Sequence, residues 1–213
     1  METRGLGQPV QPHLDAWKAE YGKARWLGPY DIAPIVAAVR PGALMLDAGC
    51  GSGRLAVPLA RASYRVVGLD LVRESLLETR GRGAVAPVEG DVRQMPFRDG
   101  AFDAVVCYDV LQHLLGPERA RAAEEIWRVL APGGTAFIAA FGREDMRYGG
   151  DEVEPHTFRR ESGIVYHYFS EEELRGLLSR FGRVRVENVV THRTFRGGEH
   201  TRHRLFASGL KEP

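Results

Sequence analysis

The segment LMLDAGCGSGR at residues 44–54 constrains this chain more than any other, because it combines a strand end, a glycine loop and a helix start. An apolar run ends at Asp47, and glycines follow as Gly49, Gly51 and Gly53. Glycine permits a tight turn and a close approach of the backbone to a ligand, which the N–H groups of the next helix can bind. The spacing differs from the G-x-G-x-x-G of dinucleotide-binding proteins. Taken alone, the loop could also be only a tight strand–helix turn.

Two further acidic residues follow predicted strands. Asp70 closes the apolar run VVGLD, and Asp91 comes shortly after the strand predicted near residues 84–88. A carboxylate at the tip of the second strand can accept both hydroxyls of a ribose. Asp91, beside the apolar Val92, can take an adenine amino group, although turn chemistry after Gly90 is an alternative. Together with the glycine loop, these acids predict a nucleoside-shaped site at the carboxyl ends of parallel strands.

Short apolar runs alternate with helical patterns along the chain, which predicts an α/β sheet with crossover helices. We expect strands at residues 43–46, 65–69, 84–88, 102–108, 135–141, 184–190 and 204–208. We expect helices at residues 13–27, 30–39, 54–62, 73–80, 117–130 and 170–180. Ser170 followed by three glutamates predicts the N-cap of the last helix. Residues 143–169 are mostly polar, which predicts an irregular lid or substrate-binding insertion.

Length and composition limit the class of protein. The 213 residues suit one domain, and no run approaches 18 apolar residues, so we expect no membrane span. The first residues contain no apolar run typical of a signal peptide, which favours a cytoplasmic location. Cys50 and Cys107 lack metal-ligand spacing, so we expect reduced thiols and neither a disulfide framework nor a structural zinc site.

Basic residues gather near the C-terminus although the net charge is only +1. Residues 180–211 contain eight arginines and lysines against two glutamates. A solvated face of a terminal hairpin explains this pattern, and a surface that contacts phosphate is the alternative. The basic residues are Arg180, Arg183, Arg185, Arg193, Arg196, Arg202, Arg204 and Lys211.

In order and spacing, the motifs resemble the class I S-adenosylmethionine-dependent methyltransferases. LDAGCGSGR is similar to the first motif of that family and GLD to the second. GDVRQMPF and FDAVVCYDVLQHL are similar to the third and fourth, and RVLAPGG to the turn before the fifth strand. The resemblance covers residues 43–142.

The resemblance implies a Rossmann-like α/β fold with a seven-stranded, mostly parallel sheet in the order 3-2-1-4-5-7-6, ending in an antiparallel hairpin. It divides one domain into an N-terminal helical lid (1–40), a cofactor-binding core (43–142), a substrate lid (143–169) and a C-terminal helix and hairpin (170–213). It implies that S-adenosyl-L-methionine binds through residues from all of the first four strand ends. These residues are Asp47, Gly49, Gly51, Gly53, Asp70, Leu71, Asp91, Val92 and Tyr108.

Methyl transfer from a sulfonium needs alignment, exclusion of water and, for some acceptors, removal of a proton. His113 in VLQHL is the candidate general base or orienting residue, with packing or capping as the alternative. Some relatives bind a divalent metal through E-x-x-E-H, but Gln112 stands here in place of a charged ligand, so we expect no metal. Aromatic residues that could wall the substrate pocket, or simply pack, are Trp17, Tyr21, Tyr166 and His167.

Three functions remain open at this point. The favoured one is transfer of a methyl group to a small-molecule acceptor, as in ubiquinone-biosynthesis and tellurite-resistance enzymes. The second is methylation of tRNA, because QMPFRDGAFDAVV and YHYFSEEEL loosely resemble wobble-uridine methyltransferases and the C-terminal residues are basic. The third is a non-catalytic protein that binds S-adenosylmethionine, since one scaffold serves many functions.

Overall fold

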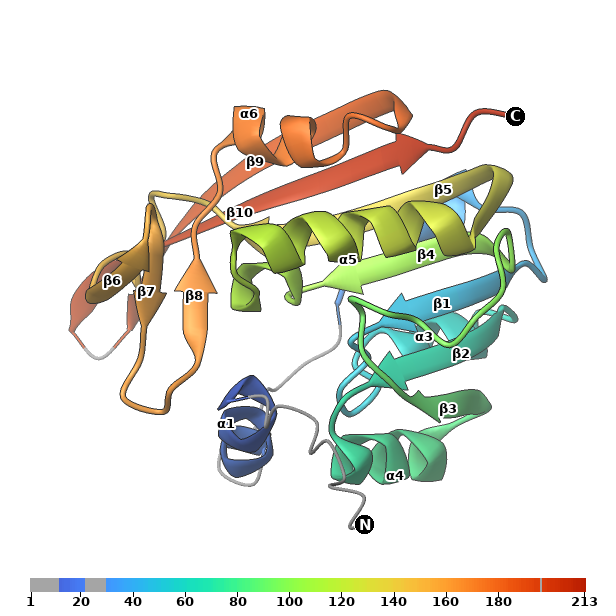
Figure 1. Cartoon of the computed structure of the whole chain (residues 1–213), viewed down its shortest axis with the longest axis horizontal. Helices are drawn as coiled ribbons and strands as arrows, with labels where there is room; N and C mark the ends of the chain where they lie inside the picture. Colours follow the sequence, from blue (N-terminus) through green and yellow to red (C-terminus); the bar gives the residue numbers. More distant parts are fainter. Residues whose placement is uncertain (1–11, 22–29, 196) are drawn as a thin grey trace, which may run out of the picture.

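The computed structural model describes residues 12–21, 30–195 and 197–213, and its centre is a seven-stranded sheet (Figure 1). The strand order is β3-β2-β1-β4-β5-β10-β9, and β10 runs antiparallel to both of its neighbours, β5 and β9. This confirms the expected order, because three short strands outside the sheet take the numbers β6 to β8. The sheet strands are β1 (Leu44–Ala48), β2 (Arg65–Asp70), β3 (Val85–Glu89), β4 (Phe102–Tyr108), β5 (Leu130–Phe141), β9 (Gly182–Phe195) and β10 (Gly198–Leu210).

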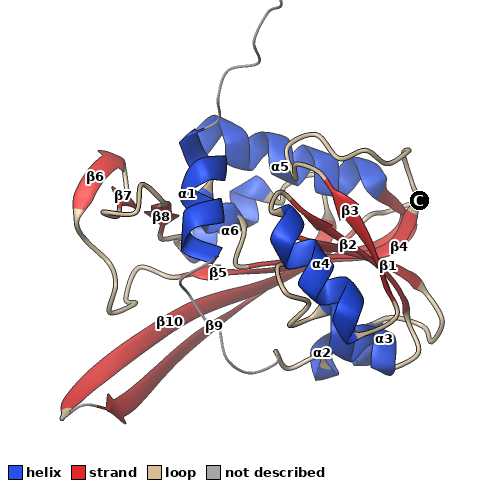
Figure 2. Ribbon diagram, turned by 90° about the horizontal axis from the view of Figure 1, so that it is seen from below, coloured by secondary structure: helices blue, strands red, loops and turns tan. Residues whose placement is uncertain are grey.

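Helices cover both faces of the sheet (Figure 2). One hydrophobic cluster joins the sheet to α5 and α6 through Ile126 and Leu174, and a second joins it to α2, α3 and α4 through Ile35, Leu59 and Leu76. Strands buried on both faces are expected to be apolar runs, as β1 and β4 are. The helices are α1 (Pro12–Tyr21), α2 (Ala33–Ala38), α3 (Ala56–Arg61), α4 (Arg73–Arg82), α5 (Gly116–Val129) and α6 (Glu171–Leu177), with a short 3₁₀ turn, η1 (Leu111–His113).

The helix starts follow local chemistry. The Ser170 hydroxyl accepts the N–H of Glu173 at 3.1 Å, which confirms the predicted N-cap of α6. At α5, the Glu118 carboxylate accepts the N–H of Leu115 at 3.0 Å, so it binds a backbone group that the helix itself leaves unpaired. Helix α1 ends at Tyr21 in the described residues, and residues 22–27 of the longer helix we predicted lie outside them.

The expectation of an irregular 143–169 segment is wrong. It contains a three-stranded antiparallel sheet of β6 (Asp151–Glu154), β7 (Thr157–Arg159) and β8 (Val165–His167). Each strand has only three or four residues, too few to show an alternating pattern. The small sheet has its own aromatic core, in which Phe158 and Tyr168 pack on Phe141 of β5.

The C-terminal hairpin is longer than the sequence predicted. Strand β10 pairs with β5 only between Arg204 and Leu210, whereas it pairs with β9 back to Gly198. The distal half is therefore a two-stranded ribbon that extends beyond the main sheet (Figure 2). Its residues are mostly polar, so hydropathy does not reveal them as strands.

Lys211 secures the end of α5. Its ammonium group donates to the carbonyls of Trp127 at 2.9 Å and Leu130 at 2.7 Å and lies 3.9 Å from the Trp127 ring centroid. The last carbonyls of a helix lack partners within it and attract a cation.

We therefore expect Lys211→Met to lower the free energy of unfolding by about 1–2 kcal/mol. Urea unfolding of the purified variant measures this, with Arg121→Met, an exposed change on the same helix, as the control. The control should stay within about 0.5 kcal/mol of wild type. Equal losses in the two variants would contradict the role of Lys211.

Candidate functional site

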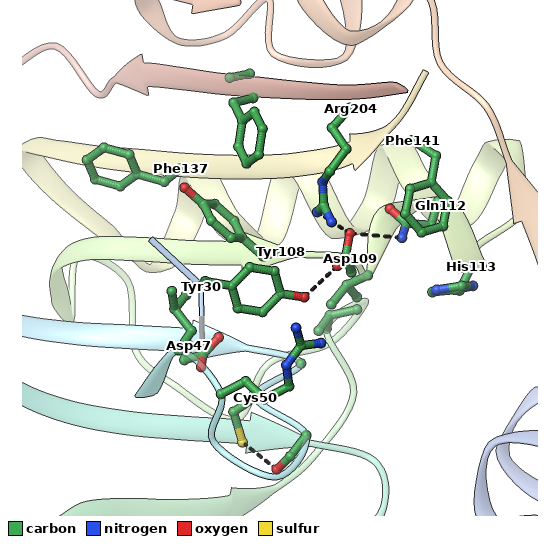
Figure 3. Close-up of a pocket in the computed structure, with 18 of the residues that line it drawn as sticks. Tyr30, Asp47, Cys50, Tyr108, Asp109, Gln112, His113, Phe137, Phe141 and Arg204 are labelled. Carbon is green, nitrogen blue, oxygen red and sulfur yellow. Dashed lines mark hydrogen bonds and ion pairs between the residues drawn. The ribbon is translucent and has the colours of Figure 1, made fainter. Parts of the chain in front are cut away.

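A cavity of about 1620 Å³ opens where β1, β2 and β4 end (Figure 3). It is larger than the roughly 300–1000 Å³ of a typical pocket for one small molecule, and its lining continues along the hairpin as far as Thr194. We call one part of its lining the glycine-loop half: Asp47, Gly49, Cys50, Gly51, Ser52, Asp70, Leu71, Asp91 and Val92. We call the other the aromatic half: Trp17, Tyr30, Tyr108, Asp109, Gln112, His113, Phe141, Arg147, Tyr166 and Arg204.

The glycine loop requires its glycines for two different reasons. The N–H groups of Gly49 and Cys50 both donate to the Leu69 carbonyl, at 2.7 and 2.9 Å, which holds the loop against the end of β2. Gly51 has φ +49°, and a Cβ added there would meet no protein atom within 4 Å. The backbone at Gly51 is therefore open to a ligand in the cavity. Gly53, by contrast, does not line the cavity, and a Cβ there would lie 2.9 Å from Val57.

Gly53 thus packs against its neighbours, and the structure does not bring it to the cavity with the other predicted cofactor residues of the loop. Its φ of +81° and its closeness to α3 and α4 explain why glycine is needed at this position.

Two carboxylates lie beside the loop, Asp47 buried and Asp70 half-buried. Asp70 accepts the N–H of Gly51 at 2.8 Å and that of Val72 at 2.9 Å, and burial raises its pKa. Each carboxylate oxygen can accept a second hydrogen bond, so Asp70 keeps acceptor capacity toward the cavity. Asp47 is 2% exposed, and its Oδ2 has no hydrogen-bond partner among the described residues. Burial raises the pKa of Asp47 to about 7, which marks a carboxyl group without a compensating cation.

Asp91 is held differently. Burial alone would raise its pKa, but the hydrogen bonds and charge of Arg93 outweigh burial and lower it. The Arg93 guanidinium also pairs with Glu118 of α5, so this acid is fixed in its ionised form at the cavity edge. Val92 and Leu71 line the same part of the cavity.

Asp109 is the centre of the aromatic half (Figure 3). Its carboxylate accepts the Tyr30 hydroxyl at 2.5 Å, the Arg204 guanidinium at 2.5 Å and the Gln112 amide at 3.2 Å. Asp109 therefore joins the segment before α2, the hairpin and η1. The φ of Asp109, +60°, is unusual for a residue with a side chain, and such backbone conformations are common at functional sites. Gln112 is fully buried, and its Oε1 has no partner among the described residues.

His113 faces the cavity with a defined tautomer. Its Nδ1 lies 3.0 Å from the Val165 carbonyl, which can only accept, so Nδ1 carries the hydrogen and Nε2 the lone pair. Burial lowers the pKa of His113 to about 4, so the ring is neutral near pH 7. Trp17 and Tyr166 contact the ring edge-on, with centroids 4.6 and 4.7 Å away. His113 thus offers one lone pair to the aromatic half.

His167 does not line the cavity, which corrects its expected place in the substrate pocket. It is 1% exposed, its Nδ1 lies 2.7 Å from the Thr157 hydroxyl, and its Nε2 lies 2.7 Å from the Glu173 carboxylate. Both ring nitrogens are occupied in joining β7, β8 and α6. Trp17, Tyr21 and Tyr166 do line the cavity, but Tyr21 donates to Glu78 of α4 and so stands beside the glycine-loop half.

Sequence reasoning missed several polar residues of the aromatic half. Asp109 directly follows the end of β4. Carboxylates at the ends of parallel strands lie at the ligand-binding edge of the sheet, so the pattern that predicted Asp70 also predicts Asp109. Tyr30, Arg147 and Arg204 come from three distant segments and carry no local signal. Within the described ranges, no three His, Cys, Asp or Glu side chains are grouped to hold a metal ion, and no helix is long and apolar enough to cross a membrane.

Comparison with known proteins gives the family. A family model described as "Methyltransferase domain" matches residues 46–138. A protein of Encephalitozoon cuniculi whose name describes it as a methyltransferase is 33% identical over 151 residues, which cover 65% of this chain and 69% of that protein. A solved S-adenosylmethionine-dependent methyltransferase from Methanosarcina mazei is 26% identical with a TM-score of 0.68, over 87% of this chain and all of that one. The chain belongs to the S-adenosylmethionine-dependent methyltransferases, as the motifs indicated.

Two curated relatives with named acceptors are longer proteins. The tRNA N(3)-methylcytidine methyltransferase Mettl2 of Drosophila melanogaster is 27% identical over 76% of this chain, which spans 56% of that protein. The ubiquinone biosynthesis O-methyltransferase of Xanthomonas campestris is 34% identical over 48% of this chain and 45% of its own length. The chain thus spans about half the length of these two relatives.

Proposed function

We propose that this chain transfers the methyl group of S-adenosylmethionine to a small-molecule acceptor. The observation that carries the proposal is the open backbone at Gly51 beside buried Asp47 and half-buried Asp70, all of which line one large cavity. The names of the two relatives describe different reactions, so this chain's own residues must indicate the acceptor. The proposal keeps the cytoplasmic location expected from the sequence, in keeping with two buried, free cysteines.

The residues of the glycine-loop half suit the cofactor. Asp70 has acceptor capacity left for the ribose hydroxyls, and the unpartnered Oδ2 of Asp47 suits a donor at the methionine end. Gly49 and the open backbone of Gly51 would lie along that end, with Tyr108 close by. Leu71, Asp91 and Val92 would enclose the adenine. The bound cofactor supplies a methyl group activated by a sulfonium.

The aromatic half would hold the acceptor. His113 lines the cavity, and its Nε2 carries a lone pair because its Nδ1 faces the Val165 carbonyl. The adjacent Gln112 is fully buried, and its Oε1 has no partner among the described residues. We assign to His113 Nε2 the hydrogen bond from the acceptor's nucleophilic O–H or N–H group, which would aim the nucleophile's lone pair at the methyl group. The same nitrogen would take up the proton that this group loses when it is methylated. Trp17 and Tyr166, which pack on His113, would exclude water from this point.

Cofactor binding tests the proposal without knowledge of the acceptor. Asp70→Ala should weaken S-adenosylhomocysteine binding by about 2 kcal/mol, the scale of charge-assisted hydrogen bonds. Isothermal titration measures it, with Asp151→Ala, an exposed carboxylate outside the cavity, as the matched control. Equal affinity in the Asp70 variant and wild type, or tighter binding of NAD than of S-adenosylhomocysteine, would refute the assignment.

Methylation of tRNA is the second candidate, favoured by one feature of the hairpin. Arg185, Arg202 and Arg204 lie on its cavity-facing side, so a basic surface continues from the cavity along β9 and β10. Arg196, which we also expected to contribute, lies outside the described residues. Incubation with labelled S-adenosylmethionine and either total tRNA or a metabolite extract separates the candidates by which fraction gains the label. No label in either fraction would favour a protein that only binds the cofactor.

A further inference from the structure

Two guanidinium groups lie close to the Phe141 ring in the aromatic half. The Arg147 guanidinium lies 3.9 Å from the ring centroid and the Arg204 guanidinium 5.7 Å from it. Arg147 belongs to the loop before β6, whereas Arg204 belongs to β10, where it pairs with Phe141 itself. The two cations therefore reach the same part of the cavity from independent segments.

Both guanidiniums have N–H donors that the described protein groups do not use. A guanidinium has five such donors. Arg204 makes one hydrogen bond, from Nη2 to Asp109, and its buried Nε has no partner among the described residues. Arg147 donates from Nε and Nη2 to Asp145, and within the same ranges its Nη1 makes no hydrogen bond. A ligand with acceptor atoms on this side of the cavity would satisfy these donors.

The charge around Phe141 is positive. The fully buried carboxylate of Asp145 serves two cations, Arg147 at 2.8 Å and Arg202 at 3.0 Å. Asp109 pairs with Arg204, so two carboxylates face three guanidiniums, all of which line the cavity. His113 adds no charge near pH 7. This excess of positive charge repels the sulfonium of the cofactor unless the methyl acceptor carries a negative charge.

Aromatic rings surround the same space. Phe141 and Tyr166 lie nearly parallel, with 5° between their planes, and His113 and Trp17 continue the wall edge-on. Such a wall favours a flat apolar ligand, because aromatic rings attract one another beyond their buried area. Guanidiniums next to it match a planar carboxylate through paired N–H donors.

We infer that the methyl acceptor is an anionic aromatic compound whose carboxylate is bound by Arg147 and Arg204 and whose ring lies against Phe141 and Tyr166. This inference rests on the proposed function, because it assigns the aromatic half to the acceptor. Arg54 also lines the cavity and directly follows the glycine loop in the sequence, so we assign this guanidinium to the carboxylate of the cofactor.

The test uses 2-naphthoate and 2-naphthamide, which share shape and differ in charge. With S-adenosylhomocysteine bound, wild type should bind the naphthoate about tenfold more tightly than the amide, the difference expected for one charge-assisted contact. Arg147→Met should reduce this preference to about twofold or less. It leaves Asp145 paired with Arg202. Arg121→Met, an exposed change on α5, should keep the full preference. Ligand-observed NMR titration measures the affinity of each of the three proteins for both probes.

A second variant guards against loss of folding. Arg204→Lys keeps the charge beside Asp109 but removes the planar fork, so it should reduce the preference for naphthoate while leaving S-adenosylhomocysteine affinity within about twofold of wild type. Equal binding of both probes to wild type, or binding of neither, would overturn the inference and leave the proposed function standing. A large loss of S-adenosylhomocysteine affinity in Arg147→Met would assign this guanidinium to the cofactor and also overturn it. Failure of wild type to bind S-adenosylhomocysteine would instead refute the proposed function.

Discussion

Gly51→Ala should weaken S-adenosylmethionine binding by about 100-fold, or about 3 kcal/mol, while the protein stays folded. The added methyl group would meet no protein atom within 4 Å, and Gly51 lines the cavity. It would therefore occupy space that we assign to the cofactor, and it would keep the ligand from the backbone. Isothermal titration with the cofactor gives the affinity, and urea unfolding gives the stability.

Gly42→Ala is the matched control. Gly42 also has positive φ, +76°, and a Cβ there also meets nothing within 4 Å, but the residue lies outside the cavity. Both variants should lose about 1–2 kcal/mol of unfolding free energy, because alanine resists a left-handed conformation. Only Gly51→Ala should lose cofactor affinity. If it bound the cofactor as tightly as Gly42→Ala, the glycine loop would not approach the ligand.

The parallel part of the sheet was predictable because its strands are buried on both faces. Strand β4 begins and ends at the predicted residues, since Phe102–Tyr108 is an apolar run between turn residues. The acids at the ends of β1 and β2 were predictable for the same reason, because parallel strands bring their carboxyl ends to one edge. Asp47 and Asp70 therefore face one cavity although the sequence separates them.

The acceptor side could not be derived in the same way. Arg204 reaches Asp109 because β10 pairs with β5 in a register that places Arg204 opposite Phe141. Nothing in the local sequence fixes that register, since the distal strands are polar and the pairing is set by tertiary packing.

The error at His167 has a simple physical cause. Neighbouring residues on a strand point to opposite sides, so Tyr166 and His167 cannot both face the cavity. Strand β8 places Tyr166 opposite Phe158 and His167 opposite Thr157, which turns the histidine toward α6. The sequence carries no signal for β8, so it does not predict that Tyr166 and His167 point to opposite sides.

As pH falls below about 6.5, the buried His113 should lower the free energy of unfolding by about 3 kcal/mol, and His113→Phe should remove this loss. Burial lowers the pKa of His113 from 6.5 to about 4 in the folded protein. Between about pH 6.5 and about pH 4, the His113 imidazole is therefore protonated in the unfolded chain and neutral in the folded chain. Stability is complete above the unfolded pKa and falls with pH across this window. Phenylalanine retains the ring packing on Trp17 and Tyr166 but cannot titrate.

The measurement is the difference between urea unfolding curves of wild type and variant at about pH 4.5 and about pH 7.5. A difference is needed because other groups titrate as well: burial lowers the pKa of His167, and it raises that of Asp47 to about 7, which acts in the opposite direction. His192→Phe, on the exposed hairpin, is the control and should follow wild type at both pH values. If His113→Phe also followed wild type, burial beside Trp17 and Tyr166 would not lower the pKa of His113, and the ring would become charged as pH falls below about 6.5.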